Sequence, residues 1–172
     1  MWFVLTCAAA VVAIAAPAAL SASSSTSTSV ASLESGLLQQ LNAVRTDRGV
    51  SALRLNGKLA AAAEQHSREM ADDGYFQHDS FDGTSFSDRI AKWYPFANYR
   101  SWLVGENLLW SSPSVEPSEA VAMWMRSPAH RANILNPRWR EIGIGVVYST
   151  SARGAFTHLP VTIITTDFGV RR

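Results

Sequence analysis

Cysteine and charged residues are scarce in this chain of 172 residues. Its single cysteine, Cys7, can form neither a disulfide within the chain nor a cysteine-cluster metal site. Charged residues make up 17% of the chain, and 15 lysines and arginines nearly balance 14 aspartates and glutamates. The resulting net charge of +1 gives no broad positive surface for nucleic acid. We therefore expect neither a disulfide scaffold nor a nucleic-acid-binding protein.

Several motifs of well-known enzyme classes are also missing. The sequence contains no G-x-S-x-G nucleophile motif, no H-E-x-x-H zinc motif, no P-loop and no G-x-G-x-x-G phosphate loop. Hydrophobic residues, in contrast, make up 47% of the chain. This is enough apolar material to form the core of one domain, and the length is too short for two.

The beginning of the chain has the properties of an export signal. Residues 2–20 carry no charge, and Ala16-Pro17-Ala18 offers the small-residue pattern that signal peptidases cleave. We expect residues 1–22 to be a signal peptide and the protein to be secreted or extracellular. The alternative is that this segment stays uncleaved and anchors the protein in the cell envelope. Residues 23–32 are mainly serine and threonine, which is typical of a flexible linker.

The remaining residues, 33–172, predict a single α+β domain. Apolar spacing and capping residues indicate four helices, namely 33–48, 57–72, a short one that begins at Ser85, and one from about Pro117 to Ser127. The last third is rich in β-branched residues and predicts two antiparallel strands, 142–148 and 161–168. The sequence does not decide whether residues 103–104 or 107–110 form a further strand. Helices that precede strands in this way are expected to cover a sheet.

Three separate segments carry residues suited to acid–base chemistry or metal binding. They are Tyr75-Phe-Gln-His78, Gly105-Glu106-Asn107 and Ser127-Pro-Ala-His130-Arg131. Each segment alone is weak evidence, because histidines in folded domains are often hydrogen-bonded, partly buried side chains without a catalytic role.

Taken together with other short motifs, these segments resemble the CAP superfamily, which includes the cysteine-rich secretory proteins, antigen 5 and plant pathogenesis-related protein 1. The motifs are Asn42-x-x-Arg45-x-x-x-Gly49, Leu59-x-x-x-Ala63-x-x-His66-x-x-x-Met70, His78, Gly105-Glu106-Asn107, Trp124-Met-x-Ser127-Pro128-x-His130-Arg131-x-Asn133-Ile134-Leu135, Ile142-Gly143-Ile144-Gly145 and Asp167-Phe168. The resemblance spans residues 33–172 and is strongest to the bacterial, disulfide-free SCP-domain branch. It implies a three-layer α-β-α sandwich with a small antiparallel sheet and a cleft on one face.

The resemblance also implies a site in that cleft. Family members hold two histidines and two acidic residues there, and His78, Glu106 and His130 match three of these positions. The second glutamate is lacking, because Ser127 stands where the eukaryotic pattern has it. This departure counts against a complete acid–base tetrad.

Two neutral imidazoles form a suitable partial shell for Zn²⁺, so His78 and His130 are the expected metal ligands. Glu106 would either join them, act as a general base or accept a hydrogen bond that orients an imidazole. We expect a secreted, monomeric module whose cleft binds a divalent metal and accepts a lipid or peptide ligand. One alternative is a secreted zinc-dependent hydrolase, most plausibly a peptidase. The other is an envelope-assembly or host-interaction module with a vestigial cleft. Because the second carboxylate is missing, binding is better supported than hydrolysis.

The other histidines and the glycines have more ordinary expected roles. His66 lies on the apolar face of its helix and is expected to be packed in the core. His158 lies beside the expected hairpin and is not expected in the site. Gly143 and Gly145 are expected to permit close backbone packing at their strand.

Overall fold

The computed structural model describes residues 30–172. The expected signal peptide, residues 1–22, and residues 23–29 of the expected linker lie outside the described residues. The elements follow in the order α1 (Val30–Thr46), β1 (Arg54–Leu55), α2 (Gly57–Asp73), α3 (Phe86–Trp93), β2 (Trp102–Ser111), α4 (Pro117–Arg126), α5 (Pro128–Ile134), β3 (Glu141–Ala152), a short 3-10 helix (Gly154–Phe156) and β4 (Leu159–Arg171). Helix α1 therefore includes the last three residues that we assigned to the linker. Within residues 30–172, no helix combines the length and the apolar character needed to cross a membrane.

The four strands form one sheet in the order β1-β3-β4-β2. Strands β3 and β4 pair antiparallel, as predicted, and β4 also pairs antiparallel with β2. The strand that the sequence left open is β2, which spans both of its candidate segments. Strand β1 was not predicted, because its two residues pair parallel with β3 and are too short to show a pattern. Strand β2 is the last strand in this order and therefore lies at an edge of the sheet.

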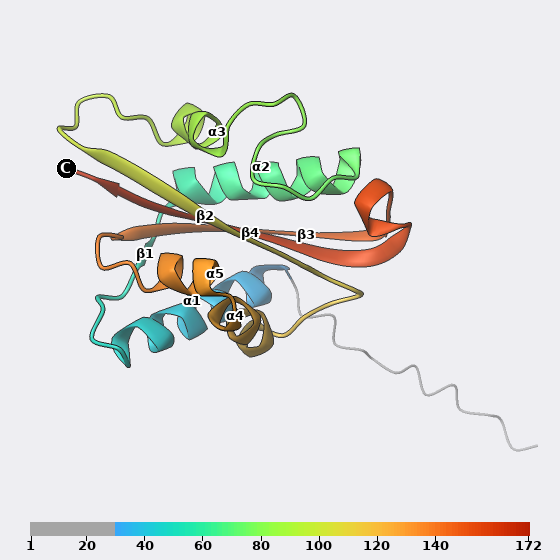
Figure 1. Cartoon of the computed structure of the whole chain (residues 1–172), viewed down its shortest axis with the longest axis horizontal. Coiled ribbons are helices and arrows are strands. Elements are labelled where there is room, and N and C mark those ends of the chain that lie inside the picture. Colours follow the sequence, from blue (N-terminus) through green and yellow to red (C-terminus); the bar gives the residue numbers. More distant parts are fainter. Residues whose placement is uncertain (1–29) are drawn as a thin grey trace, which may run out of the picture.

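Helices cover both faces of this sheet. Figure 1 shows α2 and α3 on one side and α1, α4 and α5 on the other. On the second side, buried apolar residues of α1, α4 and the sheet form the largest hydrophobic cluster, which includes Leu37, Trp124 and Phe168. The predicted α+β fold with three layers is thus confirmed.

The α2 layer lies very close to the sheet because β3 has glycines beneath it. A Cβ atom at Gly143 would lie 2.0 Å from the carbonyl carbon of Leu59, and one at Gly145 would lie 2.1 Å from the backbone nitrogen of Glu64. No side chain fits at either position without displacing the helix. The predicted close backbone packing at these glycines is confirmed.

Side chains from α4 and α5 bind the outer edge of β2. The indole Nε1 of Trp124 donates to the carbonyl oxygen of Leu108 at 2.9 Å, and Nδ2 of Asn133 donates to that of Glu106 at 3.0 Å. These bonds satisfy carbonyl groups that have no neighbouring strand. They also fix α5, and with it His130, beside the middle of β2.

Candidate functional site

The loop between α2 and α3 carries His78, and its backbone is held from both helices. Buried His66 of α2 donates from Nε2 to the carbonyl oxygen of Gln77 at 3.0 Å. Arg89 of α3 donates from Nη1 to the carbonyl oxygen of His78 at 2.8 Å. The predicted core position of His66 is therefore confirmed, and its ring fixes the residue next to His78.

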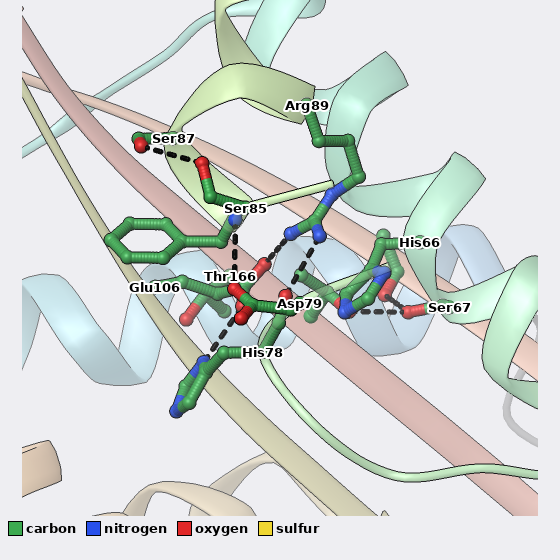
Figure 2. Close-up of polar contacts among 12 residues, drawn as sticks. His66, Ser67, His78, Asp79, Ser85, Ser87, Arg89, Glu106 and Thr166 are labelled. Atoms are coloured by element: carbon green, nitrogen blue, oxygen red, sulfur yellow. Dashed lines mark hydrogen bonds and ion pairs between the residues drawn. The ribbon is translucent and has the colours of Figure 1, made fainter. Parts of the chain in front are cut away.

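Glu106 connects this loop to the edge strand. Its Oε1 accepts a hydrogen bond from Nδ1 of His78 at 2.7 Å, and its Oε2 pairs with Nη2 of Arg89 (Figure 2). The side chain of Glu106 is 1% exposed, whereas that of His78 is 52% exposed. Because an ionised carboxylate only accepts hydrogen bonds, Nδ1 of His78 must carry a proton. When His78 is neutral, its more distant nitrogen, Nε2, therefore has a free lone pair.

His130 approaches from the opposite layer. It lies in α5, it is partly buried, and its carbonyl oxygen accepts a hydrogen bond from Nδ2 of Asn107 at 3.2 Å. Burial lowers the pKa of His130, and the positive charge of His78 lowers it further. His78 bonds to Glu106 of β2, and the backbone of His130 bonds to the next residue, Asn107. The fold thus brings the three residues singled out in the sequence to the middle of β2.

The pKa values of the two histidines are shifted in opposite directions. The hydrogen bond to Glu106 raises the pKa of His78, against the opposing effect of partial burial. The pKa of His130 is lowered, which favours the neutral form of its imidazole. Groups whose pKa values are shifted apart in this way can act as a proton donor and a proton acceptor.

Sequence reasoning missed two ionisable residues of this site. Arg89 is 1% exposed and contacts both Glu106 and His78, and Asp167 of β4 is fully buried opposite Glu106. Burial, with the charge of Glu106, raises the pKa of Asp167 well above its usual value. For Asp167, the available signal was an acidic residue within a run of β-branched residues that predicts a buried strand, because aspartate is rarely buried unless it has a partner.

The donor atoms present set a limit on metal binding. Among residues 30–172, no group of three or more His, Cys, Asp or Glu side chains is arranged to hold a metal ion. Both oxygens of Glu106 are engaged, which favours an orienting role for this residue over a general-base role. Two histidine rings do not make up a closed, four-ligand structural site.

A separate groove of about 330 Å³ lies on another face of α5. Its lining residues are Met125, Arg126, Pro128, Arg131, Ala132 and Leu135. The helical positions 128, 131, 132 and 135 share one face, and His130 points away from it. The groove is therefore distinct from the site formed by His78, Glu106 and His130.

Comparison with known proteins agrees with this architecture. The family model described as CAP, cysteine-rich secretory protein family, matches residues 38–165. YkwD of Bacillus subtilis (strain 168), described as an uncharacterized protein, is 34% identical over 123 residues, which cover 72% of this chain and 46% of that protein. The chain thus spans less than half the length of this relative.

Two solved structures share the fold. An outer surface protein from Borrelia burgdorferi has a TM-score of 0.64 and 21% identity, with 79% of this chain and 90% of that chain covered. An extracellular protein with an SCP domain from Bacillus anthracis has a TM-score of 0.58 and 26% identity, with 83% and 43% covered. The family match over most of the sequence and the common fold lead to one conclusion: this chain belongs to the CAP, or cysteine-rich secretory protein, family.

Proposed function

We propose that this CAP domain binds a divalent metal ion through His78 and His130. The observation that carries the proposal is the hydrogen bond from Nδ1 of His78 to Glu106, because it leaves Nε2 as the free nitrogen. A carboxylate behind a metal-binding histidine fixes its tautomer and orientation in many metal sites. His130, whose pKa is lowered, supplies a second neutral imidazole.

The open coordination defines the kind of ligand that would bind. A metal held by two imidazoles would supply a positive centre with positions free for water or an anionic group. A peptide or lipid that carries a carboxylate or phosphate would complete the shell. His78 would hold one position while its Nδ1–H stays hydrogen-bonded to Glu106, and Arg89 would hold the other oxygen of Glu106.

We further propose that the domain works outside the cytoplasm. The uncharged residues 2–20 support this, as do the similar chain from Bacillus anthracis, which is described as extracellular, and the shared fold of a Borrelia outer surface protein. Pulse-labelling with fractionation would show a mature form outside the cytoplasm, and a chain found only in the cytoplasm would contradict this proposal.

Zinc titration of the untagged protein tests the metal proposal. Zinc should raise the melting temperature of the wild type, with a stabilisation of about 2.7 kcal/mol when its concentration is 100 times the Kd. The double variant His78→Ala/His130→Ala should lose this response. His158→Ala is the matched control, because His158 is exposed beside the β3–β4 turn, and it should respond like the wild type. Equal shifts in all three proteins would refute the proposal.

The opposite pKa shifts of His78 and His130 favour a second candidate function, hydrolysis of a peptide or ester by acid–base catalysis. If the protein is a hydrolase, libraries of such substrates should be turned over, and His130→Ala should lower kcat by about 10² or more. Zinc binding without turnover supports the binding module. If the protein neither binds zinc nor turns over these substrates, it is an interaction module whose site is vestigial.

A further inference from the structure

Two carboxyl groups share one buried region at the site. Asp167 of β4 faces Glu106 of β2 directly in the antiparallel register, so both side chains project to the same side of the sheet. That side carries α2, because Thr165, two residues before Asp167, accepts a hydrogen bond from Ser67 of α2 at 2.8 Å. Asp167 is 0% exposed, and the side chain of Glu106 is 1% exposed.

The charges around this pair do not balance if both carboxyl groups are ionised. Arg89 is the buried cation beside this pair. Its Nη1 donates to the carbonyl oxygen of His78, and its Nη2 donates to Oε2 of Glu106. His66 of α2, a further titratable group on this side, bonds instead to Gln77 and Glu69. The positive charge of Arg89 can therefore neutralise only one of the two carboxyl groups, Glu106 or Asp167.

As an ionised group, Asp167 would have no hydrogen-bond donor to compensate its charge. Within residues 30–172, neither of its carboxyl oxygens has a hydrogen-bond partner, and Nε of Arg89 likewise makes no hydrogen bond. A buried carboxylate without a partner is so costly that such a group binds a proton instead. The raised pKa of Asp167, caused first by burial and then by Glu106, agrees with this geometry.

We propose that Asp167 is a further residue of the functional site, an uncharged carboxylic acid that leaves Glu106 as the single anion of the buried cluster. Its functional meaning rests on the proposed metal binding. With Asp167 neutral, Glu106 is the single buried anion that holds both Arg89 and His78. An ionised Asp167 would add a second buried anion beside it that has no cation of its own. Asp167 acts through Glu106 and is a positioning residue.

The pH dependence of folding in Asp167→Asn tests this proposal, since asparagine mimics the neutral acid. Above about pH 4, the unfolded wild-type chain releases the Asp167 proton that the folded protein keeps, so folding weakens as the pH rises. The variant lacks this penalty. Its unfolding equilibrium constant should fall relative to that of the wild type by up to about tenfold per pH unit until the folded pKa is reached.

The sign of this effect separates the two charge states. An ionised Asp167 with a lowered pKa predicts instead a variant that loses stability relative to the wild type as the pH rises toward about 4, with no slope above that pH, and that result would overturn the proposal. Asp73→Asn, which changes an exposed carboxyl group at the end of α2, is the matched control and should not reproduce the slope.

The wild-type protein offers a second measurement that needs no variant. In protein with ¹³C-labelled aspartate carboxyl groups, one aspartate signal should keep the chemical shift of a protonated acid at pH 7. The absence of such a signal would contradict the proposal even if Asp167→Asn failed to fold. Neither measurement involves zinc, so either proposal can fail while the other stands.

Discussion

At the scale of single residues, the energetic centre of the site is Arg89. Its buried guanidinium neutralises Glu106 and also holds the backbone of His78. Removing one member of a buried ion pair leaves the other charge buried and uncompensated. The same kind of pair on the surface contributes little, because water and salt screen it.

We therefore predict that Arg89→Met lowers the free energy of unfolding by about 3–5 kcal/mol. Urea denaturation would measure the change. Arg68→Met is the matched control, because Arg68 pairs with Glu64 at 2.6 Å while both side chains are more than half exposed, and it should cost at most about 1 kcal/mol. The double variant Arg89→Met/Glu106→Gln should recover part of the loss, since it removes the stranded anion. A cost for Arg89→Met as small as that of the control would show that the pair does not support the fold.

At the scale of elements, the contact between α2 and β3 determines the spacing of one layer. This contact depends on glycine, because backbone atoms of α2 occupy the space that a Cβ atom at Gly143 or Gly145 would need. Since backbone atoms cannot rotate away as a side chain can, the helix would have to move.

We expect Gly145→Ala to lower the free energy of unfolding by about 3 kcal/mol or more, at the upper end of what overpacking costs. Gly57→Ala provides the matched control, because a Cβ atom at the start of α2 would meet nothing within 4 Å. This change should be neutral or stabilise by about 0.5 kcal/mol. Chemical denaturation of both variants measures the change in the free energy of unfolding. Equal changes would mean that α2 does not pack directly against the glycines of β3.

Local signals explain which elements the sequence could predict. Asn56 caps α2 by accepting from the backbone of Lys58 and Leu59, and Gly74 ends the helix in a left-handed conformation. Both features follow from neighbouring residues, so the helix was predicted nearly in full. The parallel pairing of Arg54 with Glu141, in contrast, joins residues far apart in the chain. No local pattern indicates such a pairing.

At the scale of the whole molecule, the site exists because β2 is an edge strand. His78 lies on the α2 and α3 side of the sheet and bonds to Glu106, whereas His130 lies in α5 on the other side and bonds through its backbone to Asn107 of the same strand. In a central strand, a neighbouring strand would separate the two layers. The order of the strands is thus what lets residues from both layers meet the same strand.

Only part of the site could be predicted from the sequence. The family resemblance pointed to His78, Glu106 and His130, since their motifs are short and specific. It did not identify Arg89 or Asp167 as partners of Glu106, because the first depends on how α3 packs and the second on the register between β2 and β4. Charge balance within the site could be assessed only after these long-range contacts were known.

The central claim is that Glu106 holds the proton on Nδ1 of His78 and leaves Nε2 free. The most direct test is ¹⁵N NMR of the histidine side chains, recorded without metal above the pKa of His78, where the chemical shifts of the two ring nitrogens distinguish the tautomers. The account predicts that neutral His78 carries its proton on Nδ1. A proton on Nε2 would contradict it, because the bond to Glu106 and the free metal-binding nitrogen would then both be absent.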